Sequence, residues 1–258
     1  MSIQDHGDCR LSDVMMMEYF RGVIAPFCAA LFFVSLAPAA IAAGLVTGSG
    51  NPGHMVGRLW ARLSLWVAGI DVEVEGRENI PEEKSAVYAC NHASQFDIPI
   101  LYQALPIQFR FLVKQELFRV PLLGVAMKRS GYIPVDRTGG KAAMRSLMEA
   151  ASRVREGTSI VIFPEGTRSP DGRLRPFKVG AMLLAIKVGC PIVPVAISGS
   201  HRILPKGSLR VRPGRKVKVR IGPPIQAPGS MRQMSKNVVT EEVWDAVRSM
   251  LDPGNRPD

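Results

Sequence analysis

Two short polar segments contain residue types that could carry out acid–base chemistry and bind an anion. In the first, NHASQFD at Asn91–Asp97, a histidine precedes an aspartate by five positions. A neutral imidazole whose tautomer is fixed by a carboxylate can act as a general base on a hydroxyl group. Five residues of an ideal helix turn about 500°, so His92 and Asp97 can meet only if the chain turns between them. Pro99 fits the first turn of a helix that begins near Asp97.

Simpler interpretations of this segment exist. Asp97 could merely cap the following helix, and a histidine and an aspartate at this spacing arise easily by chance. Ser94 lies within the same loop and Cys90 ends the preceding apolar run, yet neither is evident as an activated nucleophile. We therefore expect His92 to act on a hydroxyl of a substrate rather than on one of the protein itself.

The second segment, FPEGTRSPDG at Phe163–Gly172, directly follows the apolar run SIVIF. Gly166 would let the backbone approach a ligand closely. Thr167 and backbone N–H groups could donate to phosphate oxygens, and Arg168 could bind a phosphate through two parallel hydrogen bonds. The alternative is a polar turn with a surface arginine. Two more cations, Lys114 in FLVKQELF and Arg137 in GYIPVDR, each follow another apolar run.

An alternation of strands and helices must position these segments. Helical patterns occupy Lys141–Arg155, Lys178–Val188 and about Thr240–Leu251, and we expect Asp252–Asp258 to be a frayed polar tail. The alternation predicts an α/β fold, a mixed sheet covered by helices, with chemistry in loops at strand ends. The predicted strands are Val72–Val74, Ala86–Cys90, Arg110–Val113, Tyr132–Val135, Ser159–Phe163, Ile192–Ile197 and Lys216–Ile221.

The N-terminal part of the chain indicates a membrane. Gly22–Val46 carries no charge over 25 residues, and a membrane-spanning helix needs roughly 20. Pro26 and Pro38 would kink or divide such a helix, so a re-entrant hairpin is an alternative to a straight span. A cleaved signal peptide fits poorly because the preceding residues are net acidic. Arginines and tryptophans within His54–Ile70 favour an interfacial helix over one packed on the domain.

The remaining composition narrows the classes of ligand. Net charge is +11, and residues 201–222 hold eight Lys and Arg with no acid, a field that attracts phosphates. No RNA-binding motif or zinc finger accompanies this charge, and the membrane segment argues further against nucleic acid. The four cysteines and four histidines lack metal-ligand spacing, so no metal site is expected. We expect membrane-anchoring and interfacial helices over residues 1–70 and an α/β catalytic domain over 71–258.

With these segments in order, the chain resembles the glycerolipid acyltransferases, and in particular the bacterial 1-acylglycerol-3-phosphate acyltransferase group. NHASQFD is similar to the NHxxxxD block of that family, and FPEGTRS is similar to its block of the same sequence. GYIPVDR and IVPVAI resemble two further blocks in the expected order. The resemblance implies transfer of a fatty acyl group from acyl-CoA or an acyl carrier protein to the sn-2 hydroxyl of 1-acylglycerol-3-phosphate, giving phosphatidic acid for phospholipid synthesis.

The resemblance also implies roles for individual residues. His92 would be the general base and Asp97 its orienting partner, and no metal or bound cofactor would be needed. The domain would lie on the cytoplasmic face of the cell (inner) membrane. Transfer to another lysolipid, such as lyso-ornithine lipid or lysophosphatidylglycerol, and a non-catalytic lipid-binding protein are alternatives. The residues expected to bind the glycerol phosphate are Lys114, Arg137, Glu165, Gly166, Thr167 and Arg168.

Overall fold

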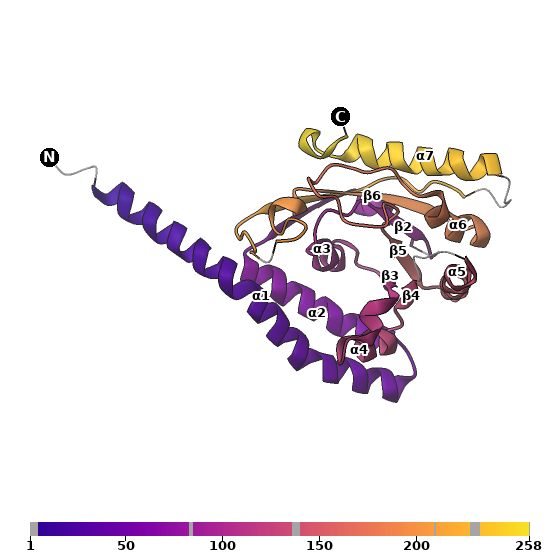
Figure 1. Ribbon diagram of the computed structural model, residues 1–258, viewed down its shortest axis with the longest axis horizontal. Helices are drawn as coiled ribbons and strands as arrows, with labels where there is room; N and C mark the ends of the chain where they lie inside the picture. The colour runs from indigo at the N-terminus through magenta and orange to yellow at the C-terminus, as the bar shows by residue number, and fades with distance from the viewer. Residues whose placement is uncertain (1–4, 83–84, 136–139, 209, 228–232, 258) are drawn as a thin grey trace.

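A seven-stranded sheet forms the centre of the protein (Figure 1). The computed structural model describes residues 5–82, 85–135, 140–208, 210–227 and 233–257. The strand order is β1-β7-β6-β2-β5-β3-β4. All seven predicted strands are confirmed, each to within one residue at either end. They are β1 (Asp71–Glu75), β2 (Val87–Cys90), β3 (Phe109–Lys114), β4 (Ile133–Val135), β5 (Ser159–Ile162), β6 (Ile192–Ser198) and β7 (Lys216–Ile221).

The sheet is mixed, as predicted. Only β6 and β7 pair antiparallel among the described strands, and all other neighbours run parallel. In the register of the central strands, Val87 lies opposite Ile160 on one side and Ile192 on the other. The carboxyl ends of β2, β3, β5 and β6 therefore meet at one edge, where loops of parallel sheets collect functional residues.

Helices cover both faces of the sheet. Successive residues of β2 point to opposite sides, so Tyr88 packs into one hydrophobic core and Val87 into the other. The helices α2 (Asn51–Ala68) and α3 (Asp97–Ala104) contribute Leu65 and Ile100 to the core around Tyr88. The opposite core is closed by α5 (Gly140–Arg155), α6 (Val179–Val188) and α7 (Gln233–Met250). The predicted helix at Thr240 thus begins earlier, at Gln233.

The N-terminal helix α1 (Asp5–Thr47) is continuous and contains both Pro26 and Pro38. The prolines therefore do not divide it, and the chain reverses only after it, at residues 48–50, where Gly48 has a φ of 63°. Met16–Thr47 is long and apolar enough to cross a membrane, with a mean hydropathy of 2.2, and only 17% of its most apolar stretch is buried. This helix indicates membrane association.

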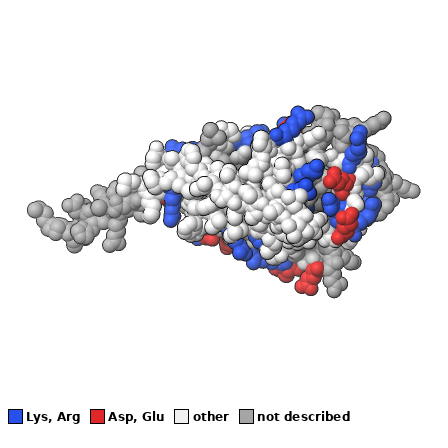
Figure 2. All heavy atoms as spheres, turned by 90° about the horizontal axis from the view of Figure 1, so that it is seen from below, with Lys and Arg blue, Asp and Glu red and all other residues white. Residues whose placement is uncertain are grey.

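One face of α1 packs along the α/β domain. A Cβ on Gly22 would lie 2.6 Å from the carbonyl oxygen of Val211, and one on Gly44 would lie 2.9 Å from that of Arg129. The buried face carries small side chains, whereas the opposite face exposes large ones, among them Phe27 and Leu31. Figure 2 shows the underside of the molecule, where α1 lies, as a broad uncharged surface with charged side chains around its margin. The apolar stretch of α1 thus lies against the domain at both its ends.

Helix α2 is built into the domain rather than only lying beside it. Its residues Leu65 and Ala68 are buried in the same core as β2. Arg58 donates two hydrogen bonds of 2.9 Å to the carbonyl oxygens of Leu105 and Ile107. Trp66 on the opposite face is 75% exposed. Helix α2 therefore packs on the domain, and an interfacial role for its exposed face stays a prediction.

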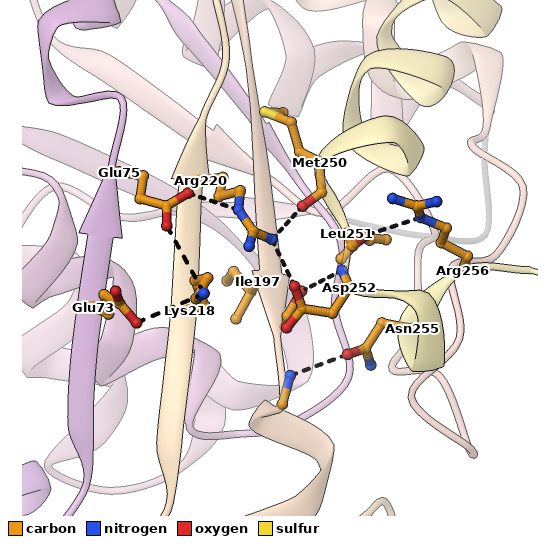
Figure 3. A network of polar contacts seen from close by, with 12 residues as sticks. Glu73, Glu75, Ile197, Lys218, Arg220, Met250, Leu251, Asp252, Asn255 and Arg256 are labelled. Atoms are coloured by element: carbon orange, nitrogen blue, oxygen red, sulfur yellow. Dashed lines mark hydrogen bonds and ion pairs between the residues drawn. The ribbon is translucent and has the colours of Figure 1, made fainter.

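The chain after α7 is ordered, so the predicted frayed tail is wrong for residues 252–257, while Asp258 lies outside the described residues. Figure 3 shows Asp252 accepting a 2.8 Å hydrogen bond from Arg220 of β7. Asn255 is 3% exposed. Its side chain accepts from Gly199 N–H at 3.2 Å and donates to Gly172 O at 2.7 Å. The segment is polar because its side chains bind buried backbone groups.

Candidate active site

His92 and Asp97 contact each other at the carboxyl edge of the sheet. The distance between His92 Nδ1 and Asp97 Oδ2 is 2.7 Å, and Asp97 is the first residue of α3. The same oxygen accepts from the N–H groups of Ala93 and Ser94 at 2.8 and 2.9 Å. Asp97 thus binds the loop before α3 rather than capping the helix. Because a carboxylate only accepts, Nδ1 carries the proton and Nε2 is left with a free lone pair.

The loop that carries His92 is fixed to neighbouring parts of the sheet. The Asn91 side chain donates to the carbonyl oxygen of Ile197 at 2.9 Å and accepts from its N–H at 2.7 Å. Ser94 Oγ donates to the carbonyl oxygen of Leu204 at 3.0 Å. The His92 ring remains 17% exposed, whereas Asp97 is fully buried. A rigid loop with one accessible imidazole nitrogen suits a general base.

The second polar segment forms the wall behind His92. Glu165 Oε1 accepts a 2.8 Å hydrogen bond from the backbone N–H of His92, and Ser169 N–H donates to the carbonyl oxygen of His92 at 2.7 Å. Phe163 stacks on the imidazole with ring centroids 4.0 Å apart. The two polar segments, 73 residues apart in sequence at His92 and Glu165, therefore form a single unit.

Glu165 is buried, with 3% of its surface exposed. Burial raises the pKa of its carboxyl from 4.5 to about 8, and the nearby charge of Asp97 adds to the increase. Its second oxygen has no hydrogen-bond partner among the described residues. Glu165 thus contacts the backbone of the proposed base, and its predicted role in binding the glycerol phosphate stays a prediction.

The predicted phosphate loop has an exposed, basic rim. Gly166 has a φ of 75°, and a Cβ there would lie 3.0 Å from Lys178 Nζ. Lys206 Nζ donates to the carbonyl oxygen of Arg168 at 3.0 Å and lies 3.4 Å from Thr167 Oγ1. Lys178 and Lys206 were not predicted as site residues. Lys206 lies in the basic stretch of residues 201–222, and that stretch was the only sequence signal for it.

The other predicted cations are less directly placed. Lys114 ends β3 at the same edge of the sheet and forms a 3.1 Å ion pair with Glu116, with about half of its side chain exposed. Arg137 lies outside the described residues. Among the residues that the structure describes, no cluster of His, Cys, Asp and Glu has the geometry to hold a metal ion. The chemistry that the described groups support is proton removal by His92 beside a basic surface.

Comparison with known proteins gives one consistent family. Residues 71–198 match the sequence model of the family described as Acyltransferase. A Brassica napus protein named 1-acyl-sn-glycerol-3-phosphate acyltransferase BAT2, chloroplastic, is 37% identical over 173 residues, 67% of this chain and 50% of that protein. The chain spans 50 to 61% of the length of the first plant relatives it matches.

The match to one bacterial relative spans a larger share of that relative's length. The 1-acyl-sn-glycerol-3-phosphate acyltransferase of Borreliella burgdorferi is 31% identical over 195 residues, which are 76% of this chain and 77% of that protein. The fold agrees with a crystal structure of the 1-acyl-sn-glycerophosphate (LPA) acyltransferase PlsC from Thermotoga maritima. The TM-score is 0.75 at 26% identity, over 92% of this chain and 97% of that one. The chain therefore belongs to the acyltransferase family.

Proposed function

We propose that the protein transfers a fatty acyl group from a thioester donor to the sn-2 hydroxyl of 1-acylglycerol-3-phosphate, which gives phosphatidic acid. Plant and bacterial relatives that carry the name of this activity support the acceptor. The observation that carries the proposal is the 2.7 Å contact between His92 Nδ1 and Asp97 Oδ2. That contact leaves Nε2 free to take a proton from the acceptor hydroxyl.

In the proposed reaction, His92 Nε2 removes the proton as the acceptor oxygen attacks the carbonyl carbon of the thioester. Asp97 stabilises the imidazolium that forms. The tetrahedral oxyanion then collapses, the carbon–sulfur bond breaks, and the imidazolium returns its proton to the leaving thiolate. The products are the acylated lipid and the free thiol of coenzyme A or acyl carrier protein. This sequence needs no nucleophile from the protein itself.

We assign two supporting roles around this reaction. Glu165 positions His92 through its backbone N–H, as the 2.8 Å hydrogen bond supports. Thr167 and Arg168, together with Lys206 on the same loop surface, would bind the phosphate of the acceptor through charge-assisted hydrogen bonds. The positive charge that Lys114 and Arg137 add near this edge is a further expectation from their place in the sequence.

The proposed membrane position follows from α1. Its apolar face is exposed over the length that packs on the domain, so a bilayer-spanning orientation would carry domain loops into the hydrocarbon region. We infer that α1 lies within the membrane–water interface, with the domain on the cytoplasmic side, where soluble acyl thioesters are available. In this arrangement α1 is the main membrane element, and α2 packs into the α/β unit.

The test is acyl transfer by the purified full chain in detergent, with labelled acyl-CoA and, separately, acyl carrier protein as donors. The acceptors are 1-acylglycerol-3-phosphate, lysophosphatidylglycerol and lyso-ornithine lipid. We expect conversion of 1-acylglycerol-3-phosphate that is lost in His92→Ala, which serves as the control for contaminating enzymes. Transfer only to another of these lysolipids would mean that the protein acts on that acceptor instead. No transfer from either donor would favour a lipid-binding protein without activity.

A further inference from the structure

A second apolar surface lies beside α1, on the segment formed by the short helix Gln115–Arg119 and by α4 (Leu123–Arg129). We call residues 115–129 the η2–α4 segment. Leu117, Val120 and Val125 are exposed by 42, 43 and 49%. These three aliphatic side chains lie within nine residues of sequence. Exposed apolar side chains that gather in this way mark an interaction site more often than scattered ones do.

The segment is tightly folded, so the exposure of these side chains is fixed by its backbone. The N–H of Leu123 donates to the carbonyl oxygen of Pro121 at 2.7 Å, which places Leu122 in a γ-turn with a φ of 61°. Leu122 is the only residue other than glycine with a positive φ in the described chain. Gly124 N–H donates to the carbonyl oxygen of Val120 at 2.8 Å. The strained turn at Leu122 therefore lies between two of the exposed side chains, Val120 and Val125.

The η2–α4 segment lies directly beside the C-terminal part of α1. Gly44 of α1 approaches Arg129 so closely that a Cβ there would lie 2.9 Å from the Arg129 carbonyl oxygen. The two helices lie side by side at the bottom of Figure 1. The view from below in Figure 2 shows a broad uncharged surface with Lys and Arg side chains around its margin. The segment is therefore close to the surface on which α1 is proposed to lie.

Cations flank the apolar side chains. Arg119, Lys128 and Arg129 are exposed, and none of them forms an ion pair with another described residue. The one acidic residue of the segment, Glu116, pairs with Lys114 at 3.1 Å. Aliphatic side chains bordered by Arg and Lys are the composition that binds the headgroup region of anionic bilayers. The charge thus favours a lipid surface over an apolar protein partner.

We propose that the η2–α4 segment is a second membrane contact, which places Leu117, Val120 and Val125 among the headgroups of an anionic bilayer. The inference rests on the proposed interfacial position of α1. One helix lying in the interface leaves the domain free to roll about the helix axis, whereas a second contact fixes its orientation. The segment directly follows Lys114 at the end of β3, so this contact holds the carboxyl edge of the sheet near the lipid surface.

A fluorophore on the segment tests the contact directly. The full chain with Cys9→Ser and Cys28→Ser retains only Cys90 and Cys190, which are buried, so an introduced cysteine can be labelled selectively. We would attach an environment-sensitive dye at Val120→Cys. Val238→Cys on α7 is the matched control, because Val238 is 55% exposed on the far side of the molecule.

The vesicles contain phosphatidylcholine with one-third phosphatidylglycerol, and co-sedimentation measures the bound fraction. We expect blue-shifted, stronger emission on binding for the dye at position 120 and an unchanged spectrum at 238. An unchanged spectrum at both positions in fully bound protein would overturn the second contact and leave the α1 proposal standing. Protein that stays in the supernatant would overturn both.

A variant separates membrane contact from catalysis. In Leu117→Ser/Val120→Ser/Val125→Ser we expect vesicle affinity to fall at least about tenfold, since three half-exposed aliphatic groups are removed. Transfer to lysophosphatidate in vesicles should fall with it, while transfer to a short-chain, monomeric lysophosphatidate should be unchanged. Met144→Ser/Met148→Ser/Val238→Ser, with three equally exposed apolar residues on α5 and α7, should alter neither. Equal loss on both substrates would show a folding defect and contradict the inference.

Discussion

Glu165 contacts His92 through the backbone and not through the ring: its Oε1 accepts the His92 N–H at 2.8 Å. Asp97 accepts at 2.7 Å from the imidazole of the same residue. Two buried carboxyl groups thus hold the proposed base at two points, one at its main chain and one at its side chain. Each carboxylate also has an oxygen without a partner among the described residues. Replacing Glu165 and replacing Asp97 should therefore have different effects on catalysis.

Replacing His92 tests the base itself. We expect His92→Ala to lower kcat by a factor of about 100 to 10,000, the usual contribution of a general base. The ring packs on Phe163 but is not part of a hydrophobic core, so folding and vesicle binding should persist. Steady-state transfer rates and circular dichroism check the two expectations. A folded variant with near-normal turnover would contradict the proposed mechanism.

Replacing Glu165 distinguishes positioning from substrate binding. Glu165→Gln keeps a carbonyl oxygen that can accept the His92 N–H, whereas Glu165→Ala leaves that N–H without its partner. We expect kcat to fall at least about tenfold in Glu165→Ala with little change in the acceptor KM, and to be largely retained in Glu165→Gln. If the acceptor KM rose similarly in both variants, Glu165 would be a ligand of the substrate instead.

The stability of the protein should depend on the protonation of Glu165. Because burial raises its pKa from 4.5 to about 8 in the folded state, the folded chain keeps a proton that the unfolded chain loses. The stabilisation is complete below pH 4.5 and is lost as the pH rises toward 8. We expect the unfolding free energy of Glu165→Gln minus that of the wild type to increase between pH 5 and 8 by on the order of a few kcal/mol, which urea unfolding at each pH measures. A constant difference would contradict the protonated state.

Arg168 is expected to bind the acceptor phosphate. Arg168→Ala should raise the acceptor KM at least about tenfold and leave the donor KM unchanged, because one charge-assisted bidentate contact is lost. Arg248→Ala on α7 is the control for charge, since it removes the same charge from an exposed residue that is distant in the fold. A rise in the donor KM in place of the acceptor KM would reassign the loop to the thioester.

Asn255 is expected to stabilise the two loops it joins. Asn255→Ala leaves Gly199 N–H and Gly172 O without partners, at a cost of about 1–3 kcal/mol each when buried. For a chain of this size, we expect the melting temperature to fall by about 5–10 °C. Asn255→Asp keeps the oxygen that accepts from Gly199 N–H, so its melting temperature should fall less. Differential scanning calorimetry compares the two, and equal melting temperatures for Asn255→Ala and the wild type would refute this role.

Local patterns predicted much of the fold. Strands such as β2 and β5 are apolar on both faces and bounded by polar loops, so their bounds follow from sequence within one residue. Helix geometry showed that His92 and Asp97 can meet only if the chain turns between them, and the family resemblance implied their pairing, which the structure contains. These successes share a cause, since each depends on residues that are near one another in the chain.

The misses depend on distant contacts. Glu165 bonds to a residue 73 positions earlier, and a carboxylate beside a glycine and an arginine gives no local sign of burial. Asn255 lies in a polar segment that looks solvated, yet its partners Gly172 and Gly199 come from loops elsewhere. Pro26 and Pro38 suggested a divided helix, but packing of α1 on α2 and α4 accompanies a continuous one. Tertiary packing overrides local propensity at all these places.

The pairing of β1 with β7 has a consequence for biosynthesis. Glu75 and Arg220, which join these strands, are 145 residues apart in sequence, and β7 is the only described neighbour of β1 in the sheet. A growing chain on the ribosome must therefore expose α1, α2 and β1 long before β7 emerges. Contacts of such large sequence separation form slowly. During that interval the apolar face of α1 would be available to chaperones or to lipid, so we expect the nascent chain to reach the membrane before its sheet is complete.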